Sequence, residues 1–236
     1  MNRKQLIFIK DWINSVLFAL VFAFLFQTFL YQPFKIPSGS MEPNLLIGDY
    51  LFVEKFAYGY NNSSLSFWVN ELELTDKQIE FTKPQRGDII VFNIEADNKH
   101  YIKRIIGMPG DHIRLQQGEV YVNGDKLPRV ELQKKIVHGQ MRVVYKETLP
   151  NGVAYNIYKD PINGMQKSNF DEIEYVVPAD SYFCMGDNRD NSRDSRYLNE
   201  MGYIKAGMIS GKAKFLFFTA AAWKSFNIDR VFTLIK

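Results

Sequence analysis

An uncharged apolar run near the N-terminus constrains this chain more than any other feature. It extends from Trp12 to Phe34 and reads WINSVLFALVFAFLFQTFLYQPF. A helix of about twenty apolar residues crosses the hydrocarbon layer of a bilayer, so the run is long enough to span it. A cleavable secretory signal has a shorter apolar region that ends in small residues, whereas this run ends in bulky ones. We predict a retained transmembrane helix, with a cleaved signal or a buried helix of a soluble protein as the alternatives.

Three basic residues, Arg3, Lys4 and Lys10, precede or begin this segment. Basic flanks stay on the cytoplasmic side, which predicts a cytoplasmic N-terminus and a large domain across the membrane. Trp12 and Tyr31 lie near the two ends of the run, where membrane interfaces favour aromatic residues. We expect a single-pass protein of the inner (cytoplasmic) membrane, with the large domain on the periplasmic or extracytoplasmic side and in contact with lipid.

Composition and charge exclude several other classes of protein. The 236 residues carry a net charge of +3 with no long run of lysine or arginine, so no nucleic-acid partner is expected. His100, His112 and His138 do not have the spacing of a metal-ligand set, and we predict no metal and no cofactor. The single cysteine, Cys184, excludes an intrachain disulfide and is expected to be buried.

The chain after residue 35 is rich in short apolar or alternating runs that turn signals separate, which is typical of β-strands. Two Asn-Gly pairs, Asn123-Gly124 and Asn151-Gly152, predict hairpin turns of type I′ because such turns need two residues with positive φ. The predicted fold class is mainly β: an N-terminal transmembrane helix followed by a β-rich core with an inserted β subdomain.

We divide the chain into an anchor with a cytoplasmic N-terminus (1–34), a core (35–113 and 178–216), an inserted β subdomain (114–177) and an apolar C-terminal tail (217–236). Residues 58–85 are less regular, and we expect them to cross the surface and to touch the membrane through Phe67 and Trp68. For the tail, contact with lipid and packing against the core are both open.

Two serines, Ser38 and Ser40, lie between prolines in PSGSMEPN, just after the apolar run. A serine hydroxyl needs a base to become a nucleophile at neutral pH. A histidine triad is one alternative. Lys103, in the apolar stretch HYIKRIIGMPGD, is the other, because lowering a lysine pKa to about 8 takes roughly 3 kcal/mol of desolvation. From its spacing alone, Lys103 is better explained as an edge-strand lysine that prevents aggregation.

A third stretch, YFCMGDNRDNSRDSRYL at 182–198, combines acidic, basic and turn-forming residues after a short apolar strand. A solvated loop of compensating charges explains this composition, and such surface pairs contribute little to stability. The same density of short donors and acceptors also suits a polar platform beneath an active site. The pattern alone leaves both interpretations open.

Together these stretches resemble the bacterial type I signal peptidases, membrane-bound serine–lysine proteases that remove signal peptides from exported preproteins. Four segments carry the resemblance, in the order the family shows and after a transmembrane helix: PSGSMEPNLLIGDYLFVEKFAYG (37–59), RGDIIVF (86–92), YIKRIIGMPGD (101–111) and YFCMGDNRDNSRDSRY (182–197). The resemblance implies that the β-rich core is a protease core and that preprotein signal peptides are its substrates.

Position by position, the resemblance implies that Ser40 is the nucleophile of an acyl-enzyme mechanism and that Lys103 is its general base. It implies that the Ser38 hydroxyl joins the Ser40 amide in an oxyanion hole and that Ser192 orients the lysine amine. The remaining implied residues are two supporting ion pairs, Asp187 with Arg104 and Asp194 with Arg196.

The family cleaves after small residues at P1 and P3, the first and third positions before the scissile bond. By similarity, shallow apolar pockets for these residues would be lined by Phe34, Ile36, Met41, Leu45, Tyr101 and Ile102. Asn44 departs from the threonine that is more usual at its position. Alternatives to the signal peptidase reading are a self-cleaving repressor-type protease, an organelle inner-membrane peptidase with the same dyad, and a tethered β scaffold without activity.

Overall fold

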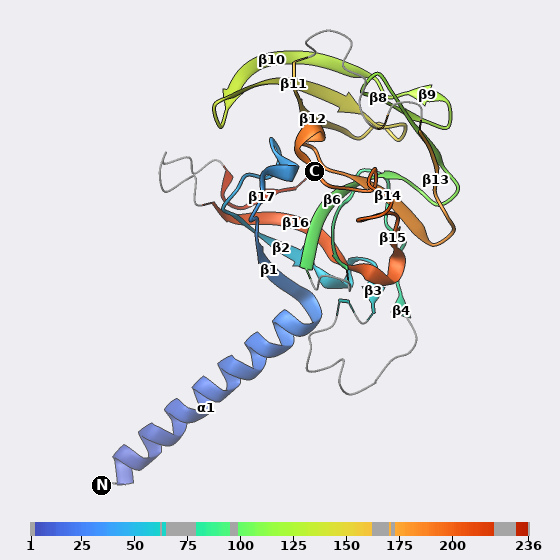
Figure 1. The fold of residues 1–236 in the computed structure, drawn as a ribbon. Coiled ribbons are helices and arrows are strands. Elements are labelled where there is room, and N and C mark those ends of the chain that lie inside the picture. Colours follow the sequence, from blue (N-terminus) through green and yellow to red (C-terminus); the bar gives the residue numbers. More distant parts are fainter. Residues whose placement is uncertain are drawn as a thin grey trace.

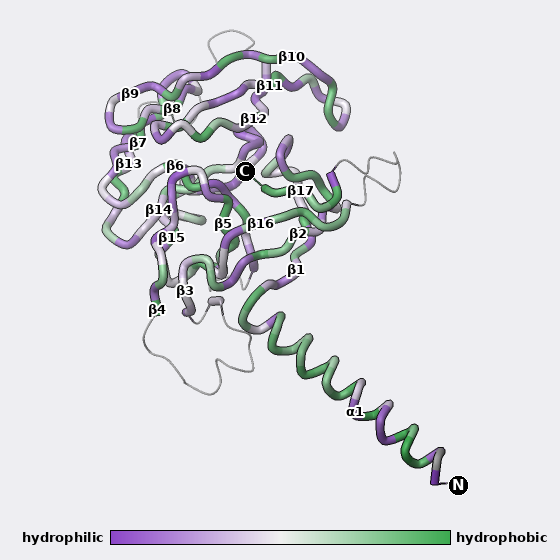
Figure 2. The backbone as a smooth tube through the Cα atoms, turned by 180° about the vertical axis from the view of Figure 1, so that it is seen from behind, coloured by the Kyte–Doolittle hydropathy of each residue, from purple (hydrophilic) through white to green (hydrophobic). Residues whose placement is uncertain are grey.

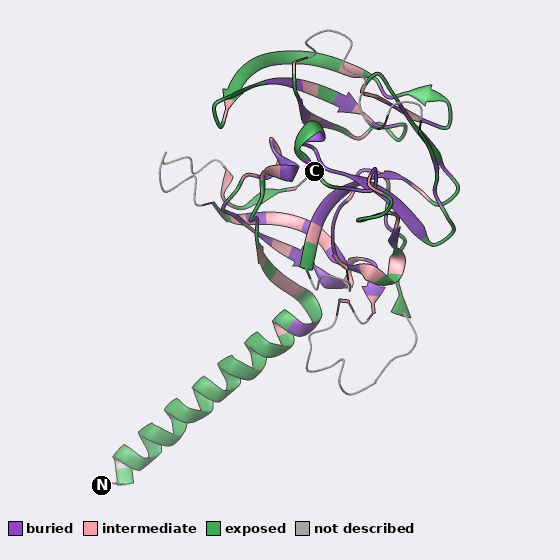
Figure 3. Cartoon of the chain, in the orientation of Figure 1, coloured by how far each residue is buried: buried purple, intermediate pink, exposed green. Residues whose placement is uncertain are grey.

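The computed structural model describes residues 3–61, 63–64, 79–94, 99–161, 170, 173–219 and 230–235. Helix α1 (Arg3–Leu25) continues into a π-helical turn (Phe26–Leu30), and Figure 1 shows it extending away from a β-rich body. The apolar side chains of α1 are exposed along its length, as Figures 2 and 3 show. Residues Gln5–Leu30 form a helical segment long and apolar enough to cross a membrane, which fits the predicted anchor.

The helix is shorter at its C-terminal end than the apolar run. Tyr31, Gln32 and Phe34 belong to β1 (Tyr31–Lys35) and not to the helix, so this part of the prediction is wrong. The reason is Pro33, which cannot donate a backbone hydrogen bond and which disfavours the helical conformation at the residue before it. The chain therefore leaves the helix and enters a strand without an intervening loop.

The main sheet is antiparallel and has eight strands in the order β1-β2-β16-β5-β6-β14-β15, with β17 paired to β16. Its strands after β1 are β2 (Asp49–Glu54), β5 (Ile89–Ile94), β6 (Lys99–Gly107), β14 (Ser181–Met185), β15 (Ile204–Lys205), β16 (Ile209–Thr219) and β17 (Thr233–Leu234). Neighbours in this sheet come from distant parts of the chain, so segments 31–54, 89–107 and 181–219 are brought together in one body.

Two smaller antiparallel sheets come from the segment between β6 and β14. One has the order β13-β7-β8-β9, from β7 (His112–Gln116), β8 (Glu119–Val122), β9 (Asp125–Lys126) and β13 (Glu174–Val176). The other has the order β10-β11-β12, from β10 (Arg129–Val137), β11 (Gln140–Thr148) and β12 (Ala154–Lys159). Figure 1 shows β10 and β11 as a long hairpin above the main sheet.

A short pair, β3 (Gly59–Tyr60) with β4 (Ile79–Glu80), and four 3₁₀ turns complete the described elements. These turns are Gly39–Met41, Lys55–Ala57, Arg189–Asn191 and Ala206–Met208. Phe67 and Trp68, the residues expected to touch the membrane, lie outside the described residues, and so does most of the tail. The four-part division of the chain stays a prediction, although β16 continues to Thr219 and β7 begins at His112.

The two Asn-Gly pairs behave differently. Asn123 and Gly124 have φ values of 53° and 90° between β8 and β9, which confirms the predicted two-residue hairpin. Asn151 does not have positive φ, so the type I′ prediction is wrong there. It lies in a longer connection between β11 and β12, where its side chain donates to the Arg86 carbonyl at 2.7 Å.

The apolar interior consists of three clusters of buried side chains. One lies around the start of β2 and the turn that precedes it, and includes Ile36, Met41 and Leu45. A second joins β7, β8 and β12 to β14, and therefore fastens the smaller sheets to the main one. The third lies between β5, β6 and β14 and includes Cys184. The turn that carries Ser40 thus packs against the first of these clusters through Met41.

Candidate active site

Ser40 lies in the 3₁₀ turn between β1 and β2, and Lys103 lies in the middle of β6. The two are 63 positions apart in the chain, yet Lys103 Nζ donates a hydrogen bond to Ser40 Oγ at 2.7 Å. Lys103 Nζ also donates to the Ile102 carbonyl at 2.9 Å. A hydroxyl and an amine at this distance are placed for direct proton transfer.

Burial decides the electrostatics of this pair. Ser40 is 9% exposed and Lys103 is 3% exposed. Burial lowers the pKa of Lys103 to about 8, and the nearby Asp194 charge opposes that shift only in part. Cys184 is a buried free thiol in the same region, as predicted, and burial raises its pKa. A sizeable fraction of Lys103 is therefore neutral near pH 8, the state a general base needs.

The loop after β14 holds the turn that carries Ser40. Asn188 donates from its backbone amide to the Ser40 carbonyl at 3.0 Å and from Nδ2 to the Gly39 carbonyl at 2.9 Å. Gly186 allows this approach, because a Cβ there would lie 2.5 Å from the Ser40 carbonyl oxygen and 2.1 Å from Ser192 Oγ. The polar platform thus lies directly against the Ser40 turn.

Arg104 and Asp187 form a bidentate, fully buried ion pair beside Lys103. Arg104 Nε and Nη2 each donate to an Asp187 carboxylate oxygen at 2.9 Å, and Nη1 donates to the Gly87 carbonyl at 2.8 Å. The guanidinium lies over the Tyr155 ring at 4.0 Å. Since β6 carries Lys103 and Arg104 in sequence, this pair restricts the strand from which the amine projects.

Asp194 and Arg196 form the second buried pair. Arg196 Nε donates to Asp194 Oδ1 at 2.7 Å, and the Gly186 amide donates to Asp194 Oδ2 at 2.9 Å. Burial alone would raise the pKa of Asp194, but the Arg196 charge and these hydrogen bonds lower it below its usual value. Asp194 therefore remains a carboxylate. It orders the loop after β14 by bonding both the Gly186 amide and the Arg196 side chain.

The other two serines of the prediction lie at the site without a comparable bond. Ser38 precedes the 3₁₀ turn, is exposed, and makes no capping hydrogen bond with its side chain. Ser192 is buried; its hydroxyl meets no described partner at full hydrogen-bond geometry, but it faces Asp194 and helps to lower the pKa of that carboxyl. No hydrogen bond from Lys103 to Ser192 is seen in the described part of the chain. The structure brings both serines close to Ser40 in the fold, with the Ser38 hydroxyl exposed and the Ser192 hydroxyl facing Asp194.

Five of the six predicted pocket residues share one apolar cluster. Ile36, Met41, Leu45 and Ile102 are buried members of it, and Phe34 packs against it with partial exposure. Tyr101 is not brought together with them: it packs against another cluster, with its ring stacked on Phe92 at 5.9 Å between centroids. Strand alternation explains the separation, because neighbouring residues of β6 point to opposite faces.

A third buried ion pair supports the site and was missed from the sequence. Arg189 Nη1 donates to Glu147 Oε2 at 2.8 Å, Tyr155 donates to Glu147 Oε1 at 2.8 Å, and Arg189 Nη2 also bonds both partners. Burial alone would raise the pKa of Glu147, but Arg189 lowers it. This network links β11 and β12 to the loop that holds the Ser40 turn, because Glu147 and Arg189 are 42 positions apart in the chain.

Asn44 and Arg230 are further contacts that sequence reasoning did not identify. Asn44 Nδ2 donates to Asp187 Oδ2 at 2.6 Å and to the Asn156 carbonyl at 2.7 Å. Arg230 Nη2, from the tail, donates to the Asn44 carbonyl at 3.1 Å and to Asp49 Oδ2 at 2.6 Å. The segment just after Ser40 is therefore held from both sides, and only the departure at position 44 signalled it.

The described residues contain no group of three histidine, cysteine or acidic side chains able to hold a metal ion. A sequence model of the family described as "Signal peptidase, peptidase S26" matches residues 9–218. The chain belongs to this family. The resemblance drawn from its four ordered segments is confirmed, and the protein is a serine endopeptidase with signal peptidase I function.

Similar proteins agree with membership of the signal peptidase family. Signal peptidase I of Rickettsia conorii is 38% identical over 235 residues, covering 96% of this chain and 86% of the relative. Signal peptidase I of Rickettsia prowazekii is 37% identical over 236 residues, covering 97% and 88%. The crystal structure of a signal peptidase I from Enterococcus faecalis is 25% identical and covers 56% of this chain and 98% of that one, with a TM-score of 0.32.

Proposed function

We propose that this signal peptidase cleaves N-terminal signal peptides from exported preproteins with Ser40 as nucleophile and Lys103 as general base. The observation that carries the proposal is the 2.7 Å contact between Lys103 Nζ and Ser40 Oγ in a buried setting. A lysine that burial brings to a pKa of about 8 has the neutral form required of a base. The alternatives without catalysis, and those with histidine, lack any comparable contact with Ser40 among the described residues.

In the acylation step the Ser40 oxygen forms a bond to the scissile carbonyl carbon while Lys103 Nζ takes the hydroxyl proton. The negative charge moves to the carbonyl oxygen, where the Ser40 amide and the Ser38 hydroxyl are the proposed donors. The carbon–nitrogen bond then breaks, and the Lys103 ammonium returns the proton to the leaving amine. The signal peptide remains bound to Ser40 as an ester.

In the deacylation step Lys103 takes a proton from water, whose oxygen attacks the ester carbon. The bond to Ser40 breaks, and the lysine ammonium returns the proton to the serine oxygen. We assign Ser192 to orienting the lysine amine, since its hydroxyl is buried in the loop that packs against the Ser40 turn and also faces Asp194. The ion pairs Arg104–Asp187 and Asp194–Arg196 are assigned to holding the strand and loop in place.

We infer a preference for small residues at P1 and P3 from the apolar cluster beside Ser40. Ile102 belongs to this cluster and Phe34 packs against it. A substrate side chain placed there would contact large apolar side chains and not solvent. Pocket walls of this kind discriminate by size, and each excess methylene that must fit costs about 1–3 kcal/mol. Met41, Leu45 and Ile36 would support the walls from beneath.

We further propose that the N-terminus is cytoplasmic and the catalytic body extracytoplasmic, as the basic residues before the apolar run indicate. The partners are then preprotein signal peptides and membrane lipid, with no nucleic acid, metal or cofactor. A retained anchor confines enzyme and substrate to the same bilayer and raises their effective concentration.

A preprotein cleavage assay in detergent, with a chelator present, tests this proposal. Wild type should release a mature protein whose new N-terminus follows a small residue, while Ser40→Ala and Lys103→Met should lose at least about a thousandfold in rate. Arg193→Gln is the matched control, because Arg193 is 78% exposed and its ion pair among the described residues is with Glu200 at the surface. Full activity of either dyad variant, with unchanged unfolding temperature, would overturn the assignment.

A further inference from the structure

The C-terminal end of the helical segment is bonded directly to the catalytic body. Lys55 Nζ donates to the Gln27 carbonyl at 3.3 Å, and Tyr60 Oη donates to the Phe29 carbonyl at 2.6 Å. The last carbonyls of a helix lack partners within it and carry the negative end of the helix dipole. A lysine and a hydroxyl at this position therefore satisfy groups that would otherwise need water.

Lys55 is an unusual lysine that the proposed reaction does not use. It is 2% exposed, and no carboxylate lies within ion-pair distance of it among the described residues. Burial lowers its pKa to about 8. Burying an amine without an acidic partner is costly, so the contact with the helix end is its main compensation. Thr28, in the same helical turn, is also buried, which shows that the turn packs against the body.

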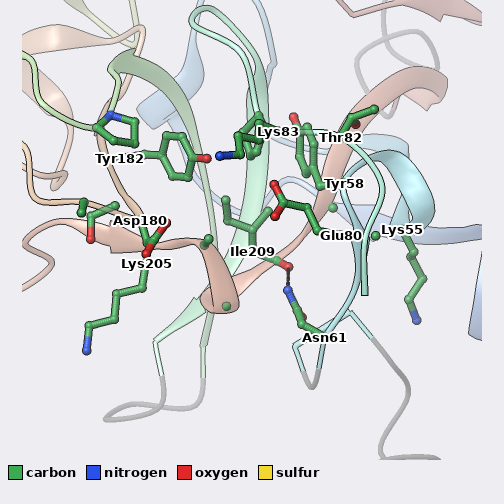
Figure 4. Close-up of a pocket in the computed structure, with 18 residues that line it drawn as sticks. Lys55, Tyr58, Asn61, Glu80, Thr82, Lys83, Asp180, Tyr182, Lys205 and Ile209 are labelled. Carbon is green, nitrogen blue, oxygen red and sulfur yellow. Dashed lines mark hydrogen bonds between the residues drawn. The ribbon is translucent and has the colours of Figure 1, made fainter. Parts of the chain in front are cut away.

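Lys55 also lines a cavity of about 390 Å³, together with Lys83 and Lys205 (Figure 4). The three amines do not converge there: Figure 4 shows the Lys55 and Lys205 side chains at opposite sides of the view, with their amines far apart. This arrangement does not suit a bound anion. The role of Lys55 is therefore better sought at the helix end than in the cavity.

The link between the helix and the nucleophile is short and regular. β1 begins at Tyr31, immediately after the helical segment, and all five of its residues pair with β2. The Tyr31 ring packs edge-on against Phe52, Phe56 and Phe215. Ser40 is ten positions after Leu30, so the proposed nucleophile lies at most roughly 35 Å from the helix end even if this link were fully extended.

We propose that Lys55 and Tyr60 form a fixed joint between the membrane helix and the catalytic body, and that this joint sets the height above the bilayer at which an embedded substrate is cut. Both are positioning residues, since neither touches Ser40 or Lys103. The proposal rests on the proposed function, because it concerns substrates whose apolar segment lies in the same bilayer. The ligand of the joint is the helix end itself, so no further partner is required.

The experiment uses the full chain in phosphatidylcholine vesicles and two kinds of substrate. The first is a series of preproteins with zero to six residues inserted between the apolar segment and the cleavage site. The second is a soluble peptide with the same cleavage-site residues and no apolar segment. Wild type is compared with Tyr60→Phe, Lys55→Met and the double variant. Lys205→Met and Tyr121→Phe are matched controls, since neither residue bonds the helix end in the described structure.

The joint predicts that wild type cleaves preproteins of one spacer length best. The double variant should lose about tenfold on that preprotein and accept the other lengths more evenly, because the effective concentration of the cleavage site at Ser40 then depends less on length. Cleavage of the soluble peptide should change by less than about twofold, which also reports that the body is folded. Both controls should keep the wild-type length profile.

Two results would overturn the proposal that Lys55 and Tyr60 form a fixed joint. One is an unchanged length profile in all three variants. The other is an equal loss on preprotein and soluble peptide, which would assign Lys55 and Tyr60 to the body itself. If Lys55→Met does not fold, Tyr60→Phe alone decides, because it removes one hydroxyl only. Failure of wild type to cleave either substrate would instead remove the proposed function, and the two failures are therefore distinguishable.

Discussion

Asn188 bonds the carbonyls of both Gly39 and Ser40, so the loop after β14 and the turn that carries Ser40 form one unit. The Ser40 hydroxyl is positioned by three contacts of its surroundings: this loop, the apolar cluster that includes Met41, and Lys103 on β6. Each contact depends on residues distant in the chain, so changes that leave the dyad itself intact should still alter activity.

The pH dependence of cleavage should report the Lys103 amine. Burial lowers its pKa from an ordinary 10.5 to about 8, and in the proposed mechanism the neutral form is the active one. The rate constant kcat/KM should therefore rise about tenfold per pH unit below pH 8 and level off above it. Steady-state kinetics on the soluble peptide measure this profile. A rate that is constant or falls from pH 6 to pH 8 would contradict the role of a neutral amine.

Gly186→Ala should disable the site while changing no catalytic group. The added Cβ would lie 2.1 Å from Ser192 Oγ and 2.5 Å from the Ser40 carbonyl oxygen, and the latter is backbone that moves only with the turn that carries Ser40. Misplacement by about 1 Å lowers a rate by about a hundredfold, and a loss of that order is expected in kcat. Gly207→Ala is the control, since its Cβ would meet nothing within 4 Å. Equal activities of the two variants would refute this account.

Glu147→Gln should lower stability because it leaves the Arg189 charge buried without its carboxylate. Removing one partner of a buried ion pair typically costs about 3–5 kcal/mol. The midpoint of denaturant unfolding measures the change. Glu131→Gln, on the exposed strand β10, is the matched control and should have an effect below about 1 kcal/mol, because its pair with Lys134 is at the surface. A similar shift in both variants would exclude the network as a stabilising element.

Arg230→Gln should reduce turnover more than substrate affinity. Arg230 lies outside the segment matched by the family, yet it bonds the Asn44 carbonyl and the buried Asp49 carboxylate. Its loss frees the segment just after Ser40, and kcat should fall about tenfold with KM nearly constant. Arg193→Gln serves again as control. A change in KM alone would indicate that the tail contacts substrate.

Local pattern was sufficient for the features that lie within one stretch of chain. The anchor follows from an uninterrupted apolar run, and the hairpin at Asn123-Gly124 follows from the φ preference of its residues. The end of the helix was misplaced because Pro33 was counted with the apolar residues around it. At Asn151 a side-chain bond to the Arg86 carbonyl outweighs the turn preference, and only the fold shows it.

Contacts between residues far apart in the chain could not be predicted from local sequence patterns. The approach of Lys103 to Ser40 was expected only through the family resemblance, since nothing in either stretch specifies the other. Glu147 and Arg189 are 42 positions apart and look like ordinary surface charges in the sequence. Their burial follows from the packing of β11 and β12 against the loop after β14, which no periodicity encodes. Tyr101 illustrates the same limit, because a one-residue step on β6 changes the face it occupies.

The burial of Cys184 has a practical consequence. It carries the one sulfhydryl of the chain, and the surrounding strands seal it from reagents in water. A cysteine introduced on an exposed position would then be the single attachment point for a spin label or fluorophore. Distances between such a label and the bilayer surface could be followed in the otherwise native polypeptide, with no background from a second thiol.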